Sequence, residues 1–275
     1  MTTLALGPEV HLGTVGLKRM ARSMEAPAAK SGPARPVSLG AIGRRAAMGR
    51  CAACELRDFT FCSALSVVEL SSLEAIVAPI RLAAGQLLFQ EGDEADCVFN
   101  VTSGVMRVYK LLPDGRRQIT GFLFAANFLG IATAGSYSYN ADAITDVELC
   151  RFGRRPLFAL FDRYPKLESR LLGIATDELT AAQDQMLLLG RKTAAEKLAS
   201  FLLGLARRAD VDGGRDDPVP VPMTRADIAD YLGLTIETVS RTVSRFKRSG
   251  LIEIGDNHDI VLARPDDLSD IAEAF

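Results

Sequence analysis

The sequence predicts an α+β protein in which an antiparallel β-roll is followed by a long helix and a C-terminal winged helix-turn-helix. Three observations lead to this fold class. Glycines punctuate short apolar runs between Arg81 and Phe152, apolar residues recur at a helical period over 172–189, and two capped segments separated by one glycine lie near the C-terminus. The expected divisions of the chain are residues 1–50, 51–164, 165–190 and 191–275.

The first 50 residues differ from the rest of the chain in charge. They hold eight basic and two acidic side chains, a net charge of +6, whereas the whole 275-residue chain carries −2. This segment is rich in Ala, Gly and Pro and has no sustained apolar period, so it is expected to be a flexible basic arm. A solvated tail explains it better than a specific nucleic-acid arm.

Composition favours an ordinary globular protein of the cytoplasm. The chain is 48% hydrophobic and 24% charged, and its longest apolar runs, such as 121–128, are far shorter than the roughly 20 residues of a membrane-spanning helix. Gly, Pro, Glu and His interrupt the N-terminal stretch, which disfavours a secretory signal. We therefore expect no membrane association and a reducing compartment, where clustered cysteines bind metal or do redox chemistry.

The β-roll is expected between Arg81 and Phe152. Glycines at 85, 92, 104, 115, 121 and 130 separate short runs with few helix signals, which is typical of a small antiparallel barrel or roll. The clearest hairpin lies in MRVYKLLPDGRRQITGF, where Pro113, Asp114 and Gly115 supply turn geometry between two strand-like flanks.

A long helix is predicted after the roll. Its apolar residues follow alternating steps of three and four, which places them on one seam: Leu172, Ala175, Leu179, Ala182, Met186 and Leu189. Such a seam either covers the protein's own core or pairs with a second copy; the heptad match and the small alanines favour a homodimer. Gly190 is expected to end this helix, and Thr193 and Glu196 form a capping box that starts the next one.

The segment MTRADIADYLGLTIETVSRTVSRFKRSGLIEI predicts a helix-turn-helix. Thr224 and Asp227 cap the first helix, Gly233 permits the tight turn, and Thr235 caps the second helix. The inward face holds Ile228, Ala229, Leu232, Leu234, Val239 and Phe246, with Thr242 where an apolar residue is more usual. The following IEIGDNHDIVL alternates around Asp256 and Asn257, as expected of a two-stranded wing.

The outward face of the second helix is suited to double-stranded DNA. The expected DNA-binding residues are Thr235, Glu237, Ser240, Arg241 and Arg245. Residues 235–248 carry a net charge of +3, which favours a phosphate surface, and Arg and Glu one turn apart can read neighbouring bases in a major groove. The alternative is that Glu237 and Arg241 form a solvent-exposed ion pair with no ligand.

Three stretches together resemble the CRP/FNR family of bacterial transcription regulators: TRADIADYLGLTIETVSR, QDQMLLLGRKTAAEKLASFL and GDEADCVFNVTSGVMRVY. The resemblance covers about residues 51–270. It implies a β-roll sensor domain, a long dimerisation helix and a winged helix for DNA. It also implies that Glu237, Ser240 and Arg241, which match the E-x-x-S-R of the oxygen-responsive FNR branch, read TTGAT-type inverted repeats. The family further suggests that residues 111–117 contact RNA polymerase.

The effector is not expected to be a cyclic nucleotide or histidine-ligated haem. Members that bind cyclic AMP hold its phosphate with a Gly-Glu-Leu stretch and a nearby arginine, whereas residues 128–141 of this chain contain no Lys, Arg or Glu. Only two histidines are present, His11 in the arm and His258 in the wing.

Cysteines remain as the candidate sensor. Cys51, Cys54 and Cys62 can wrap three corners of a metal centre, and either Cys97 or Cys150 must provide a fourth ligand. The resemblance implies Cys150, at the position of the distant ligand in oxygen-sensing relatives, and a [4Fe-4S] cluster whose loss in oxygen weakens the dimer. Structural zinc and a thiol-disulfide sensor stay open from spacing alone. No nucleophile triad, phosphate-cradling loop or paired carboxylates indicate an enzyme.

Overall fold

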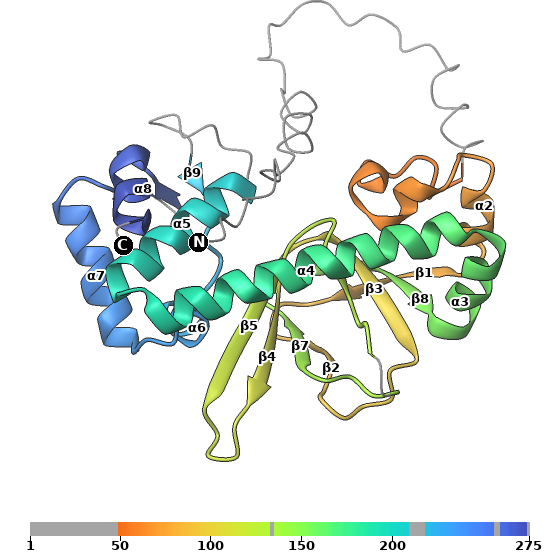
Figure 1. The fold of residues 1–275 in the computed structure, drawn as a ribbon, viewed down its shortest axis with the longest axis horizontal. Helices are drawn as coiled ribbons and strands as arrows, with labels where there is room; N and C mark the ends of the chain where they lie inside the picture. Colours follow the sequence, from red (N-terminus) through yellow and green to blue (C-terminus); the bar gives the residue numbers. More distant parts are fainter. Residues whose placement is uncertain (1–48, 133–134, 209–217, 256–258, 274–275) are drawn as a thin grey trace, which may run out of the picture.

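The computed structural model describes residues 49–132, 135–208, 218–255 and 259–273. Almost all of the predicted basic arm, and the predicted wing turn at Asp256 and Asn257, lie outside these ranges. One long helix, α4 (Pro165–Arg191), runs along the molecule (Figure 1). At one end lie a β-roll and the cysteine segment (residues 50–64), and at the other end lies a small helical domain.

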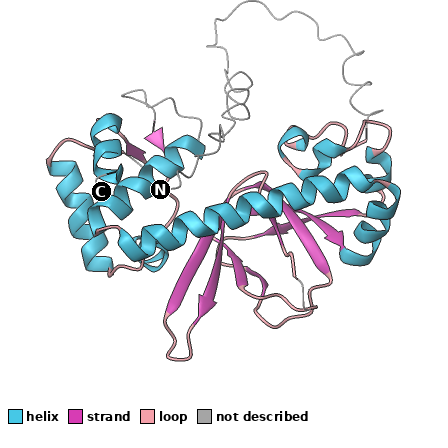
Figure 2. Ribbon diagram, in the orientation of Figure 1, coloured by secondary structure: helices cyan, strands magenta, loops and turns pink. Residues whose placement is uncertain are grey.

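Two four-stranded antiparallel sheets confirm the predicted β-roll. Their strand orders are β1-β8-β3-β6 and β2-β7-β4-β5, and they form one block on a single side of α4 (Figure 2). The strands are β1 (Val77–Leu82), β2 (Leu87–Phe89), β3 (Cys97–Ser103), β4 (Met106–Leu111), β5 (Arg117–Leu123), β6 (Phe128–Leu129), β7 (Asn140–Ala143) and β8 (Val147–Gly153).

The hairpin β4–β5 confirms the predicted turn. Leu112 N donates to Arg116 O at 2.8 Å, and Gly115 N donates to Leu112 O at 2.9 Å. Gly115 has a φ of 85°, a left-handed conformation that a residue with a Cβ adopts only with strain. The Pro-Asp-Gly triplet therefore sets this turn locally.

The described helices lie on either side of the roll in the sequence. They are η2 (Arg57–Phe59), η3 (Phe61–Ala64), α2 (Leu70–Glu74), α3 (Arg154–Arg163), α4, α5 (Ala194–Arg208), α6 (Arg225–Leu232), α7 (Ile236–Arg248) and α8 (Pro265–Glu273). With 27 residues, α4 is about 40 Å long. Every helix in the described ranges is too short or too polar to cross a bilayer.

The predicted end of α4 is one residue too early. Gly190 stays in the helix, which ends at Arg191, and Lys192 N still donates to Leu188 O at 3.3 Å. Gly190 has no left-handed φ of the kind that stops a helix. The break instead comes from the capping box of α5, in which Thr193 N donates to Glu196 Oε2 and Glu196 N to Thr193 Oγ1.

The winged helix-turn-helix is confirmed as predicted. Thr224 and Asp227 form a full capping box at α6, Gly233 ends it with a φ of 60°, and Thr235 caps α7 by accepting from Thr238 N. Thr242 is buried, and its hydroxyl donates to Thr238 O, which satisfies the polar group within the core. Strands β10 (Glu253–Ile254) and β11 (Ile260–Val261) pair, and β9 (Pro218–Val219) adds a third strand.

Candidate metal centre and nucleic-acid interface

Four of the five cysteines line one cavity. Cys51 and Cys54 come from the turns that precede η2, Cys62 from η3, and Cys150 from β8. Apolar side chains complete the cavity wall, among them Leu56 from the cysteine segment, Val77 from β1 and Phe152 from β8. The structure thus brings the predicted fourth residue to the other three.

Strand alternation separates Cys150 from Cys97. Leu149 in β8, and Cys97 and Phe99 in β3, point into the roll core, whereas Cys150 and Phe152 face the opposite side of the sheet. That outer side is covered by the cysteine segment. Cys97 is 8% exposed and packs as a small apolar side chain, in agreement with the sequence interpretation.

Packing and local hydrogen bonds hold the cysteine segment in place. Phe61, beside Cys62, is fully buried and contacts Phe128 and Phe152 edge-on at 5.3 and 5.2 Å between ring centroids. Thr60 Oγ1 accepts from Cys62 N at 3.3 Å and caps η3. At the other end of the segment, a backbone N–H donates to Glu74 and ties the first turn to α2.

The environment of the thiols disfavours their ionisation in the absence of a cation. Burial, together with the nearby Cys62 and Glu74, raises the pKa of Cys51 to about 12. Burial also raises the pKa of Cys62 to about 11, and burial with Cys54 raises the pKa of Cys150.

The donor set is one that metal centres use, because thiolates ligate both a tetrahedral zinc ion and the irons of an iron–sulfur cluster. Among the described residues, no three His, Cys, Asp or Glu side chains converge on a point where a single ion could be held. A tetrahedral zinc ion needs sulfurs within about 4 Å of one another. In a [4Fe-4S] cluster each cysteine ligates its own iron, so four thiols that line one cavity also match the number of ligands of such a cluster.

Asn100 belongs to the same cavity and was missed by the sequence analysis. It lies in β3 directly opposite Cys150, and its Nδ2 donates to Cys62 Sγ at 3.9 Å. The side chain is 3% exposed, and its Oδ1 accepts no hydrogen bond from any described residue. A polar residue amid the strand CVFNVTS was the signal for it.

The second helix of the helix-turn-helix presents the predicted recognition face. All five predicted DNA-binding residues are exposed, whereas Val239, Val243 and Phe246 face the core. Arg241 Nη2 donates to Thr238 Oγ1 at 3.4 Å, and no ion pair joins Arg241 to Glu237, both of which are described. Hydrogen bonds at the start of α7, from the Glu237 backbone and from Thr235, hold the pKa of Glu237 below its usual value.

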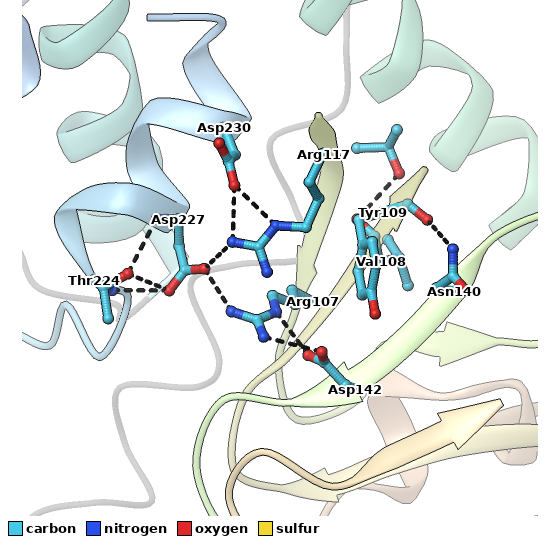
Figure 3. Close-up of polar contacts among 10 residues, drawn as sticks. Arg107, Val108, Tyr109, Arg117, Asn140, Asp142, Thr224, Asp227 and Asp230 are labelled. Carbon is cyan, nitrogen blue, oxygen red and sulfur yellow. Dashed lines mark hydrogen bonds and ion pairs between the residues drawn. The ribbon is translucent and has the colours of Figure 1, made fainter. Parts of the chain in front are cut away.

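A charge network joins the C-terminal recognition domain (α5 to α8) to the β-roll (Figure 3). The sequence analysis did not predict this network. Asp227 Oδ1 accepts from Arg107 Nη1 at 2.5 Å and from Arg117 Nη2 at 2.9 Å. Arg107 also pairs with the buried Asp142, and Arg117 Nε donates to Asp230 Oδ2 at 2.8 Å. Asp227 thus caps α6 and at the same time anchors this helix to the hairpin β4–β5.

Aromatic packing reinforces the same contact. Tyr231 of α6 lies 5.0 Å from Phe122 of β5 and 5.7 Å from Phe201 of α5, measured between ring centroids. Gln118 Nε2 donates to Asp230 O at 2.6 Å. One hydrophobic core therefore continues from the hairpin into the recognition domain.

Comparison with known proteins agrees with both halves of this architecture. Residues 79–164 match the cyclic nucleotide-binding domain and residues 196–271 the Crp-like helix-turn-helix domain. The nitrogen fixation regulation protein FixK of Bradyrhizobium diazoefficiens is 46% identical over 204 residues, which cover 74% of this chain and 86% of that protein. The chain belongs to the CRP/FNR family of transcription regulators.

Two further matches show how far this similarity extends. The transcriptional activator protein FnrL of Cereibacter sphaeroides is 41% identical over 217 residues, or 77% of this chain and 88% of that protein. The structure of FixK2 from Bradyrhizobium japonicum matches with a TM-score of 0.68 and 36% identity, over 73% of this chain and 99% of that one. Regulators of this family are not enzymes.

In this CRP/FNR regulator, most of the predicted seam lies open on α4. Leu172, Leu179 and Met186 are 67%, 59% and 69% exposed, Ala182 is exposed and Ala175 is half-buried. Leu189 differs, because it is half-buried and its Cδ2 would lie 3.3 Å from a Cβ at Gly233. The end of the seam therefore already contacts the helix-turn-helix of its own chain.

The interior of the roll in this CRP/FNR regulator is filled by aromatic side chains. Phe89 stacks on Tyr137 at 3.7 Å between ring centroids, and Phe99 and Tyr139 flank the pair. The Tyr137 hydroxyl donates to Cys97 O at 2.8 Å. Among the described residues, the buried cluster inside the roll consists of aliphatic and aromatic side chains together with Cys97.

Proposed function

We propose that this protein is an oxygen-responsive transcription regulator that binds TTGAT-type inverted repeats as a homodimer while it carries a [4Fe-4S] cluster. The observation that carries the proposal is the meeting of Cys51, Cys54, Cys62 and Cys150 at one cavity. Their sequence spacing requires the fold to bring Cys150 to the others. When bound, the cluster would be held by the thiolates of these four cysteines and would supply an iron–sulfide core that oxygen can oxidise.

The structure offers a physical route from the cysteines to the seam. Phe61, next to Cys62, shares a buried cluster with Leu167, and Leu171 and Ile174 of α4 pack against that cluster. Leu172 and Ala175 of the seam directly follow Leu171 and Ile174 along α4. Order in the cysteine segment therefore bears directly on how α4 presents its seam, which is the two-state coupling a switch requires.

The seam prediction is tested by a charge at its centre. We expect Ala182→Asp to convert the anaerobic dimer to monomer, because two unpaired carboxylates would have to be buried at the predicted pairing surface. Analytical ultracentrifugation without oxygen measures this. Thr180→Asp, also exposed on α4 but off the seam, is the control and should remain dimeric. Unchanged sedimentation of Ala182→Asp would remove the seam assignment.

The recognition face is tested by its central arginine. We expect Arg241→Ala to lose about 1–3 kcal/mol of discrimination between a TTGAT inverted repeat and a scrambled duplex, because it removes a candidate base contact. Lys247→Ala, at the exposed end of α7, should weaken binding to both duplexes alike. Fluorescence anisotropy at one salt concentration gives both constants. An equal loss on both duplexes for Arg241→Ala would assign it to the phosphates instead.

The remaining parts of the proposal concern partners and compartment. The hairpin tip at 111–116 is available for RNA polymerase, since Leu111 is 55% exposed, but Arg117 is engaged by Asp227 and Asp230. The aromatic interior of the roll supports the proposal that no cyclic nucleotide is the effector. We propose a cytoplasmic location, because a transcription regulator must reach the DNA that it binds.

Anaerobic purification tests the function as a whole. Absorption, iron, sulfide, zinc and binding to the inverted repeat are measured on one sample before and after exposure to air. A brown protein with matched iron and sulfide that bleaches and releases DNA in air is expected. A colourless protein with zinc, or with oxidised thiols and no metal, would leave a DNA-binding regulator and replace cluster chemistry by the zinc or thiol-redox alternative.

A further inference from the structure

We infer that Asn100 is a positioning residue of the four-cysteine site, whose side-chain amide donates a hydrogen bond to the Cys62 thiolate when metal is bound. This inference rests on the proposed metal centre but concerns a residue outside its ligand set. It starts from a buried asparagine whose hydrogen-bonding capacity is only partly used.

The position of Asn100 is unusual for a polar side chain. It is 3% exposed on the outer face of β3, in line with Val98 and directly opposite Cys150 in the neighbouring strand. Residues opposite each other in an antiparallel pair project on the same side of the sheet. Asn100 therefore stands beside Cys150 and, through its Nδ2, 3.9 Å from Cys62 Sγ.

Burying a side-chain amide lowers the stability of the folded state unless its polar atoms form hydrogen bonds. The Asn100 Oδ1 is left without a partner among the described residues, and a buried acceptor without a hydrogen bond destabilises the folded state. A leucine of similar size would avoid the cost. The retained amide is explained if its N–H is needed by a group that becomes negatively charged.

A metal-bound thiolate is such a group. Metal binding removes the proton of Cys62, so its sulfur becomes a pure acceptor, and Thr60 already uses the backbone N–H of Cys62. The Asn100 amide is then a side-chain N–H donor aimed at that sulfur. Donors of this kind fix the orientation of a ligand and tune the metal.

The substitutions at Asn100 are chosen to distinguish the effect of its N–H donor from the effect of its side-chain shape. Asn100→Leu keeps the approximate volume and removes both polar atoms. Asn100→Asp keeps the shape and presents only acceptors to the sulfur. Thr102→Val, which changes a hydroxyl in the same cavity wall that makes no described bond to a thiol, is the matched control.

Two loading experiments test the inference. In the first, reduced metal-free protein is titrated anaerobically with Co²⁺ and the cobalt–thiolate absorption is followed. We expect about ten-fold weaker Co²⁺ binding for Asn100→Leu, weaker binding still for Asn100→Asp, and wild-type binding for Thr102→Val. In the second, protein reconstituted with iron and sulfide is exposed to air, and the same order is expected for the rate of bleaching.

Stability of the metal-free proteins excludes a merely structural role. Because Asn100→Leu removes an orphan acceptor, its metal-free melting temperature should equal or exceed that of the wild type. Wild-type Co²⁺ affinity in Asn100→Leu, or an equal loss in Thr102→Val, would overturn the inference. If the wild-type protein binds Co²⁺ but assembles no iron–sulfur centre, the proposed function is wrong. The order of the Co²⁺ affinities among the wild type and the variants would then still decide the role of Asn100. Binding of neither would defeat both.

Discussion

Replacing Asp227 with alanine is expected to lower the free energy of unfolding by about 3–5 kcal/mol, the usual cost of removing one partner from a buried ion pair. The Asp227 side chain is 3% exposed and serves Arg107 and Arg117 together. Its loss leaves two guanidinium groups, each no more than 23% exposed, near one another without their shared anion. The substitution also removes the capping box of α6.

Urea unfolding followed by circular dichroism measures this loss. Asp230→Ala is the matched control, because Asp230 also pairs with Arg117 but is 32% exposed, and we expect it to cost no more than about 1 kcal/mol. A loss for Asp227→Ala as small as that of Asp230→Ala would show that the network contributes little to the folded state.

The same network has a predictable dependence on pH. Burial raises the pKa of Asp227, but hydrogen bonds from Thr224 and the charges of Arg107 and Arg117 outweigh it and hold the pKa below its ordinary 3.8. A carboxyl with a lowered pKa in the folded state stabilises the protein above its unfolded pKa, and this stabilisation is lost as pH falls through the folded value. The difference between wild type and Asp227→Ala should therefore be constant at neutral pH and shrink only below about pH 4.

Cys150→Ala is expected to abolish assembly of the iron–sulfur centre and, with it, anaerobic binding to the inverted repeat. The substitution would remove one of the four proposed thiolate ligands of the cluster. Cys150 lies on the sheet against which the segment with the other three cysteines packs. Iron and sulfide per protein after anaerobic reconstitution, together with anisotropy on the TTGAT duplex, report the two losses.

Cys97→Ala makes a close control for this experiment. Cys97 lies in β3, which pairs with β8, but its side chain points into the roll core. We expect this variant to keep wild-type iron, sulfide and DNA binding, with only the modest stability loss of a smaller buried side chain. If Cys150→Ala keeps a full complement of iron, or Cys97→Ala loses it, the proposed fourth ligand is wrong.

The parts of the structure that depend on neighbouring residues were predictable from the chain itself. Pro113, Asp114 and Gly115 form the predicted turn, Thr193 and Glu196 the predicted cap, and Gly233 the predicted break between α6 and α7. Each of these devices works over three or four residues, so its signal is complete within a short window. Gly190 misled the prediction of the end of α4, because a glycine can remain in a helix that packing supports.

The features that join distant segments could only be decided by the folded chain. Spacing left Cys97 and Cys150 as rivals, and the two-residue alternation of β3 and β8, once the strands are paired, put only Cys150 on the side of the other cysteines. Asn100, and the pairing of Asp227 with Arg107 and Arg117, have no local signature at all.

By itself, then, the sequence determined the order of the elements, most of the helix caps, which face of α7 is exposed and the family to which the chain belongs. The tertiary structure decided which side chains share a cavity or a charge network. The physical reason is one of range: caps and turns are formed by hydrogen bonds between residues a few positions apart, whereas burial and ion pairing depend on which faces of separate strands and helices meet.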